Sequence, residues 1–192
     1  MRHPIRHLLL GLLLAGLTAG AHAGFTLDQL MAGLAANTGG RVKFVEKRYL
    51  ALLDRPLVST GEMAYTPPDR LEKRTLTPKP ETLILDRDRV RVERDRRSYS
   101  VSLASRPEAL AFVDSVRGTL AGDRAALEKN YRLQLEGDEH AWLLTLTPTA
   151  PAVAELLRSI RVSGSGGQIH AIAYLLRDGD RSELSIEPLA AP

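Results

Sequence analysis

The chain has 192 residues, of which 44% are hydrophobic and 26% are charged, and it contains no cysteine. This composition is typical of a folded globular protein and not of a disordered chain. The lack of cysteine excludes disulfides, cysteine-ligated metals and a cysteine nucleophile.

The first 23 residues have the pattern of a secretory signal peptide. Arg2 and Arg6 form a basic start, residues 8–17 are an apolar run, and residues 21 and 23 are alanines, the small residues that a leader peptidase recognises at these two positions. The run is about half of the roughly 20 residues that span a bilayer, so we expect cleavage after Ala23 and not a retained anchor. Cleavage lowers the basic residues from 26 to 24 against 23 acidic ones, which changes the net charge from +3 to +1. A balance so near neutral gives no reason to expect a nucleic-acid partner.

The segment after the leader begins with a helical pattern and then changes to strands. Thr26 and Gln29 have the spacing of a capping box, and an apolar stripe follows as far as Leu34. From Arg41 the hydrophobic period is two, which predicts strands separated by turns rich in Pro and Asp. The predicted strands cover residues 41–53, 57–66, 70–77, 82–86, 89–93 and 97–103.

The second half of the chain mixes helices with further strands. Helical patterns cover residues 105–120, with an extra turn or two over 124–129, and residues 150–159. Alternating strands are predicted over 131–135, 141–147, 160–163, 168–177 and 181–187. The expected order is one helix, about seven strands, a helix, two strands, a helix and three strands, in a single domain over residues 24–192.

This order of elements restricts the fold class. The helices are too few to alternate with the strands, so βαβ folds are excluded. We therefore predict a mostly β (α+β) fold with a single antiparallel sheet, strongly curved or barrel-like, and helices over its apolar concave face.

Signals for catalysis or metal binding are weak. Residues 163–167 lack the spacing of a nucleophile elbow, and no helix follows them as a phosphate loop requires. His140 and His170 have no partner at ligand spacing, and the turns at 86–88 and 178–180 lack the Glu of a calcium loop. The sequence predicts no enzyme, no metal and no cofactor.

Residues 87–97 hold six arginines interleaved with acidic residues. A basic groove for anions is one interpretation. The acidic neighbours nearly cancel the charge, which favours a solvated strand face.

A curved sheet covered by amphipathic helices encloses either a packed core or an apolar cavity, and the residue pattern alone does not separate the two. The cavity corresponds to a carrier of an apolar ligand. The filled core corresponds to an interaction module that senses or chaperones envelope proteins.

Several short strings, in the same order, resemble the LolA family of periplasmic lipoprotein carriers. They are residues 44–48 (Phe-Val-Glu-Lys-Arg), 61–65 (Gly-Glu-Met-Ala-Tyr) leading into Pro68, 77–86, and the last hairpins at 164–169 and 178–182. The resemblance covers residues 25–188. Pro67 stands where the carriers have an arginine that helps to latch the lid, and residues 87–97 are more charged than the aromatic stretch typical there.

The resemblance implies an incomplete β-barrel whose concave face is closed by helices, and so it selects the cavity. It implies a non-enzymatic carrier in the periplasm of a Gram-negative bacterium, which we expect to be a monomer. Its cargo would be the acyl chains of a lipoprotein or another lipidic molecule, taken from an inner-membrane donor protein and passed to an outer-membrane acceptor. Pro67 and the charged residues 87–97 differ from the family pattern. These two differences favour an acylated or lipidic cargo other than a lipoprotein.

Strand alternation predicts which side chains line such a cavity, because one face of every strand points inward. Each chosen residue is equally compatible with an ordinary core position. The predicted lining consists of Phe44, Met63, Tyr65, Leu83, Leu85, Tyr99, Val101, Leu144, Ile172 and Tyr174 from strands, with Phe112 from the covering helix.

Overall fold

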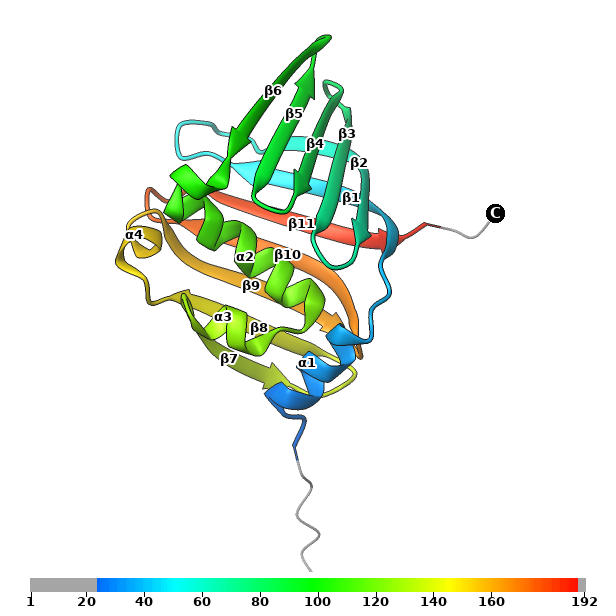
Figure 1. The fold of residues 1–192 in the computed structure, drawn as a ribbon, viewed down its shortest axis with the longest axis vertical. Helices are drawn as coiled ribbons and strands as arrows, with labels where there is room; N and C mark the ends of the chain where they lie inside the picture. Colours follow the sequence, from blue (N-terminus) through cyan, green and yellow to red (C-terminus); the bar gives the residue numbers. More distant parts are fainter. Residues whose placement is uncertain (1–23, 190–192) are drawn as a thin grey trace, which may run out of the picture.

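The computed structural model describes residues 24–189, so the predicted leader and its cleavage site lie outside the described residues. The described chain forms one eleven-stranded antiparallel sheet and four α-helices (Figure 1). The predicted fold class, a mostly β protein with a single open antiparallel sheet, is confirmed.

The first half of the chain is a helix followed by a meander of strands. Its elements are α1 (Leu27–Ala35), β1 (Gly40–Tyr49), β2 (Leu57–Thr66), β3 (Arg70–Thr77), β4 (Glu81–Asp86), β5 (Arg89–Arg94) and β6 (Arg97–Ser102). A 3-10 turn at Leu103–Ser105 leads into the helices. The second half contains α2 (Pro107–Ala121), α3 (Arg124–Glu128), β7 (Tyr131–Gly137), β8 (Trp142–Pro148), α4 (Pro151–Ala154), β9 (Leu157–Ser165), β10 (Gln168–Leu176) and β11 (Arg181–Pro188).

The strand order across the sheet is β6-β5-β4-β3-β2-β1-β11-β10-β9-β8-β7. The sheet therefore has two free edges, at β6 and β7, and is not closed into a barrel. Each half of the chain forms one half of the sheet. The halves meet where β1 pairs with β11, from Val42 opposite Pro188 to Tyr49 opposite Arg181.

The helices lie on one face of the sheet, and α2 crosses that face from the end of β6 towards α1 (Figure 1). The predicted capping box is present, because Thr26 Oγ1 accepts from the backbone N–H of Gln29 and the Gln29 side chain accepts from that of Thr26. Gly122 ends α2 with a φ of 62°. A Cβ at this position would lie 2.1 Å from the carbonyl oxygen of Met31, so glycine allows α1 and α2 to approach closely.

The packed core lies between the helices and the second half of the sheet. Trp142 is 2% exposed, and its Nε1–H donates to the carbonyl oxygen of Gly166 at 2.9 Å. The most deeply buried members of this core are Leu30, Leu34, Leu127, Tyr131, Trp142, Leu144, Leu146 and Val162.

The structure corrects one predicted number of strands and two predicted boundaries. Six strands, not about seven, precede α2. The first strand ends at Tyr49 instead of residue 53, because its partner strand β11 begins opposite it at Arg181. The helix predicted over 150–159 is confined to Pro151–Ala154, since Leu157 already pairs with Leu176 at the start of β9.

Candidate functional site

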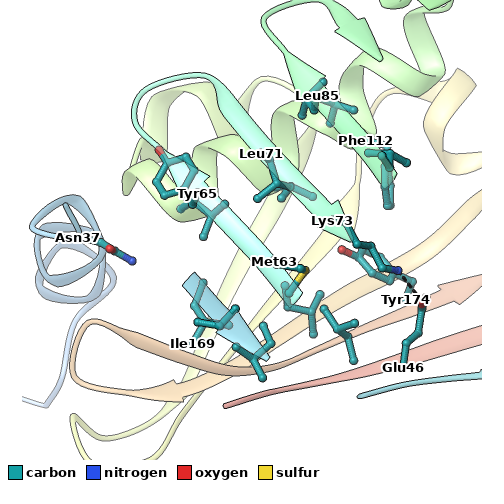
Figure 2. A pocket seen from close by; sticks show the side chains of 18 of the residues that line it. Asn37, Glu46, Met63, Tyr65, Leu71, Lys73, Leu85, Phe112, Ile169 and Tyr174 are labelled. Atoms are coloured by element: carbon teal, nitrogen blue, oxygen red, sulfur yellow. Dashed lines mark hydrogen bonds and ion pairs between the residues drawn. The ribbon is translucent and has the colours of Figure 1, made fainter. Parts of the chain in front are cut away.

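A large cavity lies between α2 and the concave face of the sheet, and we call it the α2 cavity. Its volume is about 1150 Å³, and apolar side chains form most of its wall. One end lies at the α1–β1 connection, with Asn37 and Ile169 near it (Figure 2), and the other reaches Leu156 beyond α4. The molecule thus has both a filled core, under the second half of the sheet, and a cavity.

Strand alternation and register build the sheet side of the cavity. On the first half of the sheet, Met63 lies opposite Lys73, and Tyr65 opposite Leu71. Across the next pair of strands, Leu71 lies opposite Leu85 and Lys73 opposite Leu83. Because facing residues in antiparallel strands point to the same side, these rows form one continuous wall. The second half of the sheet contributes Ile172, Tyr174 and Leu184.

Helix α2 closes the cavity with one of its faces. Phe112, Val113, Val116 and Leu120 follow the helical spacing that places side chains on one side, and all of them line the cavity. The ring of Phe112 lies 5.0 Å from that of Tyr174, centroid to centroid. On another side of α2, the buried Ser115 and Thr119 satisfy their hydroxyls on backbone carbonyls within the helix.

The structure places eight of the eleven predicted lining residues around the α2 cavity. They are Met63, Tyr65, Leu83, Leu85, Val101, Phe112, Ile172 and Tyr174. A role of these side chains in ligand binding remains a prediction.

The remaining three predicted residues lie elsewhere, and each placement has a physical reason. Phe44 is 2% exposed, with its ring packed beside Gly61 of β2 and the ammonium group of Lys73 at 4.8 Å from the ring centroid. Leu144, a residue of β8, is fully buried in the packed core together with Leu30 and Leu34 of α1. Tyr99 is 57% exposed on the edge strand β6 and does not line the cavity.

The prediction missed an ion pair in the cavity wall. Lys73 Nζ lies 2.5 Å from Glu46 Oε2, and Ser182 Oγ donates to Glu46 Oε1 at 2.7 Å. All three residues line the cavity. The signal in the sequence was Glu46 itself, a charged residue on the alternating face that also carries Val42 and Phe44.

Burial and charge shift two pKa values in this wall. Burial alone raises the pKa of the Glu46 carboxyl, but hydrogen bonds from Lys73 and Ser182 and the charge of Lys73 outweigh it, so the pKa lies below its ordinary value. Burial, with the negative charge of Glu46, raises the pKa of the Tyr174 phenol. At neutral pH the Glu46 carboxyl is therefore ionised and the Tyr174 phenol is protonated.

In the part of the chain that the structure describes, the histidine and acidic side chains do not form a metal site. Residues 24–189 contain no group of three or more acidic or histidine side chains placed to hold a metal ion. His170 lines the cavity, and its Nε2 lies 3.4 Å from Ser165 Oγ. Among the described residues, none of the helices has the length and apolar character needed to cross a membrane.

The arginine-rich run covers the turn before β5, the whole of β5 and the β5–β6 turn, and it ends at Arg97, the first residue of β6. Arg91 pairs with Glu93 at 2.8 Å, and Arg94 pairs with Glu81. The two arginine side chains are about half exposed, at 52% and 58%. These contacts are those of a solvated strand face.

The fold and the cavity together define an α+β protein with one open antiparallel sheet and an apolar chamber under its covering helix. Residues 19–187 match the family described as "outer membrane lipoprotein carrier protein LolA-like", and the chain belongs to this family. None of the curated proteins matches the sequence.

Three solved structures, from three different bacteria, are similar in fold to this chain. A LolA superfamily protein, NE2245 from Nitrosomonas europaea, is 11% identical over 86% of this chain and 93% of its own, with a TM-score of 0.43. The Pseudomonas aeruginosa MucA/MucB complex matches at 18% identity over 86% of this chain, with a TM-score of 0.46, and only 56% of that chain is covered. LprF from Mycobacterium bovis is 10% identical over 86% of this chain and 91% of its own, with a TM-score of 0.39.

Proposed function

We propose that this protein is a non-enzymatic carrier that holds acyl chains of a lipoprotein or another lipidic molecule in the α2 cavity. The observation that carries the proposal is the cavity itself. Its volume of about 1150 Å³ exceeds the range of roughly 300–1,000 Å³ common for small-molecule pockets. A filled-core interaction module has no use for such a chamber.

The binding energy would come from apolar burial. Each methylene moved out of water contributes about 0.8 kcal/mol, so ten buried methylenes contribute about 8 kcal/mol before the entropic losses of binding. On its own this energy corresponds to roughly micromolar affinity. An acyl chain therefore needs few specific contacts to be held, and it is released when a competing apolar site is offered.

We further propose that the carrier works in the periplasm, between an inner-membrane donor and an outer-membrane acceptor. The predicted leader over residues 1–23 and the family membership support this compartment. Mass spectrometry of the protein isolated from a periplasmic extract tests it, with a mature chain that begins at Gly24 as the expected result. A chain that keeps its first 23 residues contradicts the proposal.

Titration of the delipidated protein with an environment-sensitive fluorescent acyl methyl ester tests the carrier function. We expect saturable binding near one probe per protein. Leu83→Trp fills part of the cavity and should weaken binding by at least about tenfold. Ile84→Trp is the matched control, because Ile84 is the next residue of β4 and does not line the cavity. Absence of binding, or equal loss in both variants, contradicts the function.

A further inference from the structure

Four polar side chains interrupt the apolar wall of the α2 cavity. Glu46, Lys73, Tyr174 and Ser182 come from β1, β3, β10 and β11, and we call them the Lys73 cluster. Figure 2 shows Tyr174 beside the Glu46–Lys73 pair. Burying a polar group in an apolar cavity costs free energy unless the group is hydrogen-bonded. The hydrogen-bonding capacity that the cluster leaves unused therefore indicates what a ligand supplies.

The carboxylate acceptors of the cluster are occupied. Oε1 of Glu46 accepts from Ser182, and Oε2 accepts from Lys73. The hydroxyl of Ser59 adds a longer contact to Oε2 at 3.4 Å. Both carboxylate oxygens of Glu46 thus already have donors.

The donors of the cluster have spare capacity. The ammonium group of Lys73 carries three N–H bonds, and its hydrogen bond within residues 24–189 goes to Glu46 alone. One further side of the ammonium group faces the ring of Phe44. The Tyr174 hydroxyl has no hydrogen-bond partner within the same residues. These free donors favour a ligand group that accepts hydrogen bonds.

Charge decides which kind of acceptor fits. Glu46 is ionised and neutralises Lys73, so the cluster has no net charge to offer an anion. A ligand carboxylate would place a second negative charge beside Glu46, where burial reduces screening and like charges repel strongly. The carbonyl oxygen of an ester or an amide accepts the same hydrogen bonds without adding charge.

We propose that Lys73 and Tyr174 bind the carbonyl oxygen of an ester- or amide-linked acyl chain, and that Glu46 makes the cavity reject free fatty-acid carboxylates. This inference rests on the proposed carrier function. It gives the cargo a chemical class, namely acyl chains attached to a larger molecule through a neutral carbonyl group.

Three probes with the same fluorophore and the same tail test the inference on the delipidated protein at neutral pH. They are an alkane without a carbonyl, the methyl ester and the free acid. We expect the ester to bind about tenfold more tightly than the acid, because only the acid adds a buried charge. The alkane reports on the apolar cavity alone.

Two variants assign the preference to the cluster. Tyr174→Phe removes one donor and should weaken ester binding by about 2- to 10-fold while alkane binding stays unchanged. Tyr99→Phe is the matched control, because it also removes a phenol hydroxyl but Tyr99 is exposed on the edge strand β6 and does not line the cavity. Glu46→Gln leaves the charge of Lys73 without a counterion, so the free acid should now bind more tightly than the ester.

The outcomes separate this inference from the carrier function. Equal binding of ester and acid by the unaltered protein, or unchanged ester binding by Tyr174→Phe, overturns the inference. Binding of the alkane in that case leaves the carrier function standing. If none of the three probes binds, both are overturned.

Discussion

Leu144 and Met63 are both apolar strand residues expected at the cavity, and the structure places them in different environments. Leu144 is fully buried in the core, whereas Met63 lines the α2 cavity. Truncating a packed leucine leaves a void, so Leu144→Ala should lower the free energy of unfolding by about 2–5 kcal/mol. Met63→Ala should cost clearly less and weaken binding of the acyl ester probe. Denaturant unfolding and probe titration measure both effects, and equal stability losses contradict the assignment.

Glu46 should make stability depend on pH in the acid range. Its pKa in the folded protein lies below the ordinary value of 4.5, so its ionised form contributes stability that is fully present above pH 4.5. That contribution is lost as the pH falls through the folded pKa. We therefore expect Glu46→Gln to be less stable than the unaltered protein at neutral pH, with a gap that narrows on acidification. Unfolding curves over a pH series measure the gap, and a constant gap contradicts this role.

Single residues show how far the sequence predicts the site. Alternation identifies the inward face of β2, β4 and β10 correctly, because this pattern is local. It cannot place Phe44, whose ring is contacted by residues of other strands, Gly61 of β2 and Lys73 of β3. For the same reason it misses the Glu46–Lys73 pair, which forms only through the pairing of β1 with β2 and β2 with β3.

At the scale of elements, helix α2 forms the helical wall of the cavity. One of its faces borders empty space, whereas β8 and β9 are packed in the core. Local opening is easiest where few apolar contacts are lost, so the amides of α2 should exchange hydrogen faster than those of β8 and β9. Binding of the ester probe should slow exchange mainly in α2. Hydrogen-exchange mass spectrometry tests this, and equal protection of α2 and β8 without ligand counts against it.

The lengths of elements follow their partners and not only their own residues. The alternating pattern continues beyond Tyr49, but β1 stops where β11 starts, and the Arg181 guanidinium lies 3.7 Å from the Tyr49 ring centroid. The backbone N–H of Ala51 then donates to Asp180 Oδ1. The helix expected over 150–159 is shortened for a similar reason, because Leu157 pairs with Leu176. Element types are readable from local periodicity, and their ends are set by distant segments.

The whole molecule should respond to ligand as one unit, because both halves of the sheet line the cavity. A ligand that binds only the folded state at 100 times its dissociation constant adds about 2.7 kcal/mol to the free energy of unfolding. Trp142 reports on the second half of the sheet, and exchange of amides in β3 and β4 reports on the first. We expect the same stabilisation from both probes. A gain confined to one half contradicts the common cavity.

The pairing of β1 with β11 also affects when the newly synthesised chain can complete its fold. Of the described strands, β1 is synthesised first and β11 last, yet they are neighbours at the centre of the sheet. Until β11 emerges, β1 has an unpaired edge, and the two halves of the sheet, which both line the cavity, are not joined. Contacts between segments so distant in the chain form slowly, and exposed edges and apolar surfaces favour aggregation meanwhile. The newly made chain is therefore most vulnerable just before its last strand is complete, and the cavity cannot receive a ligand earlier.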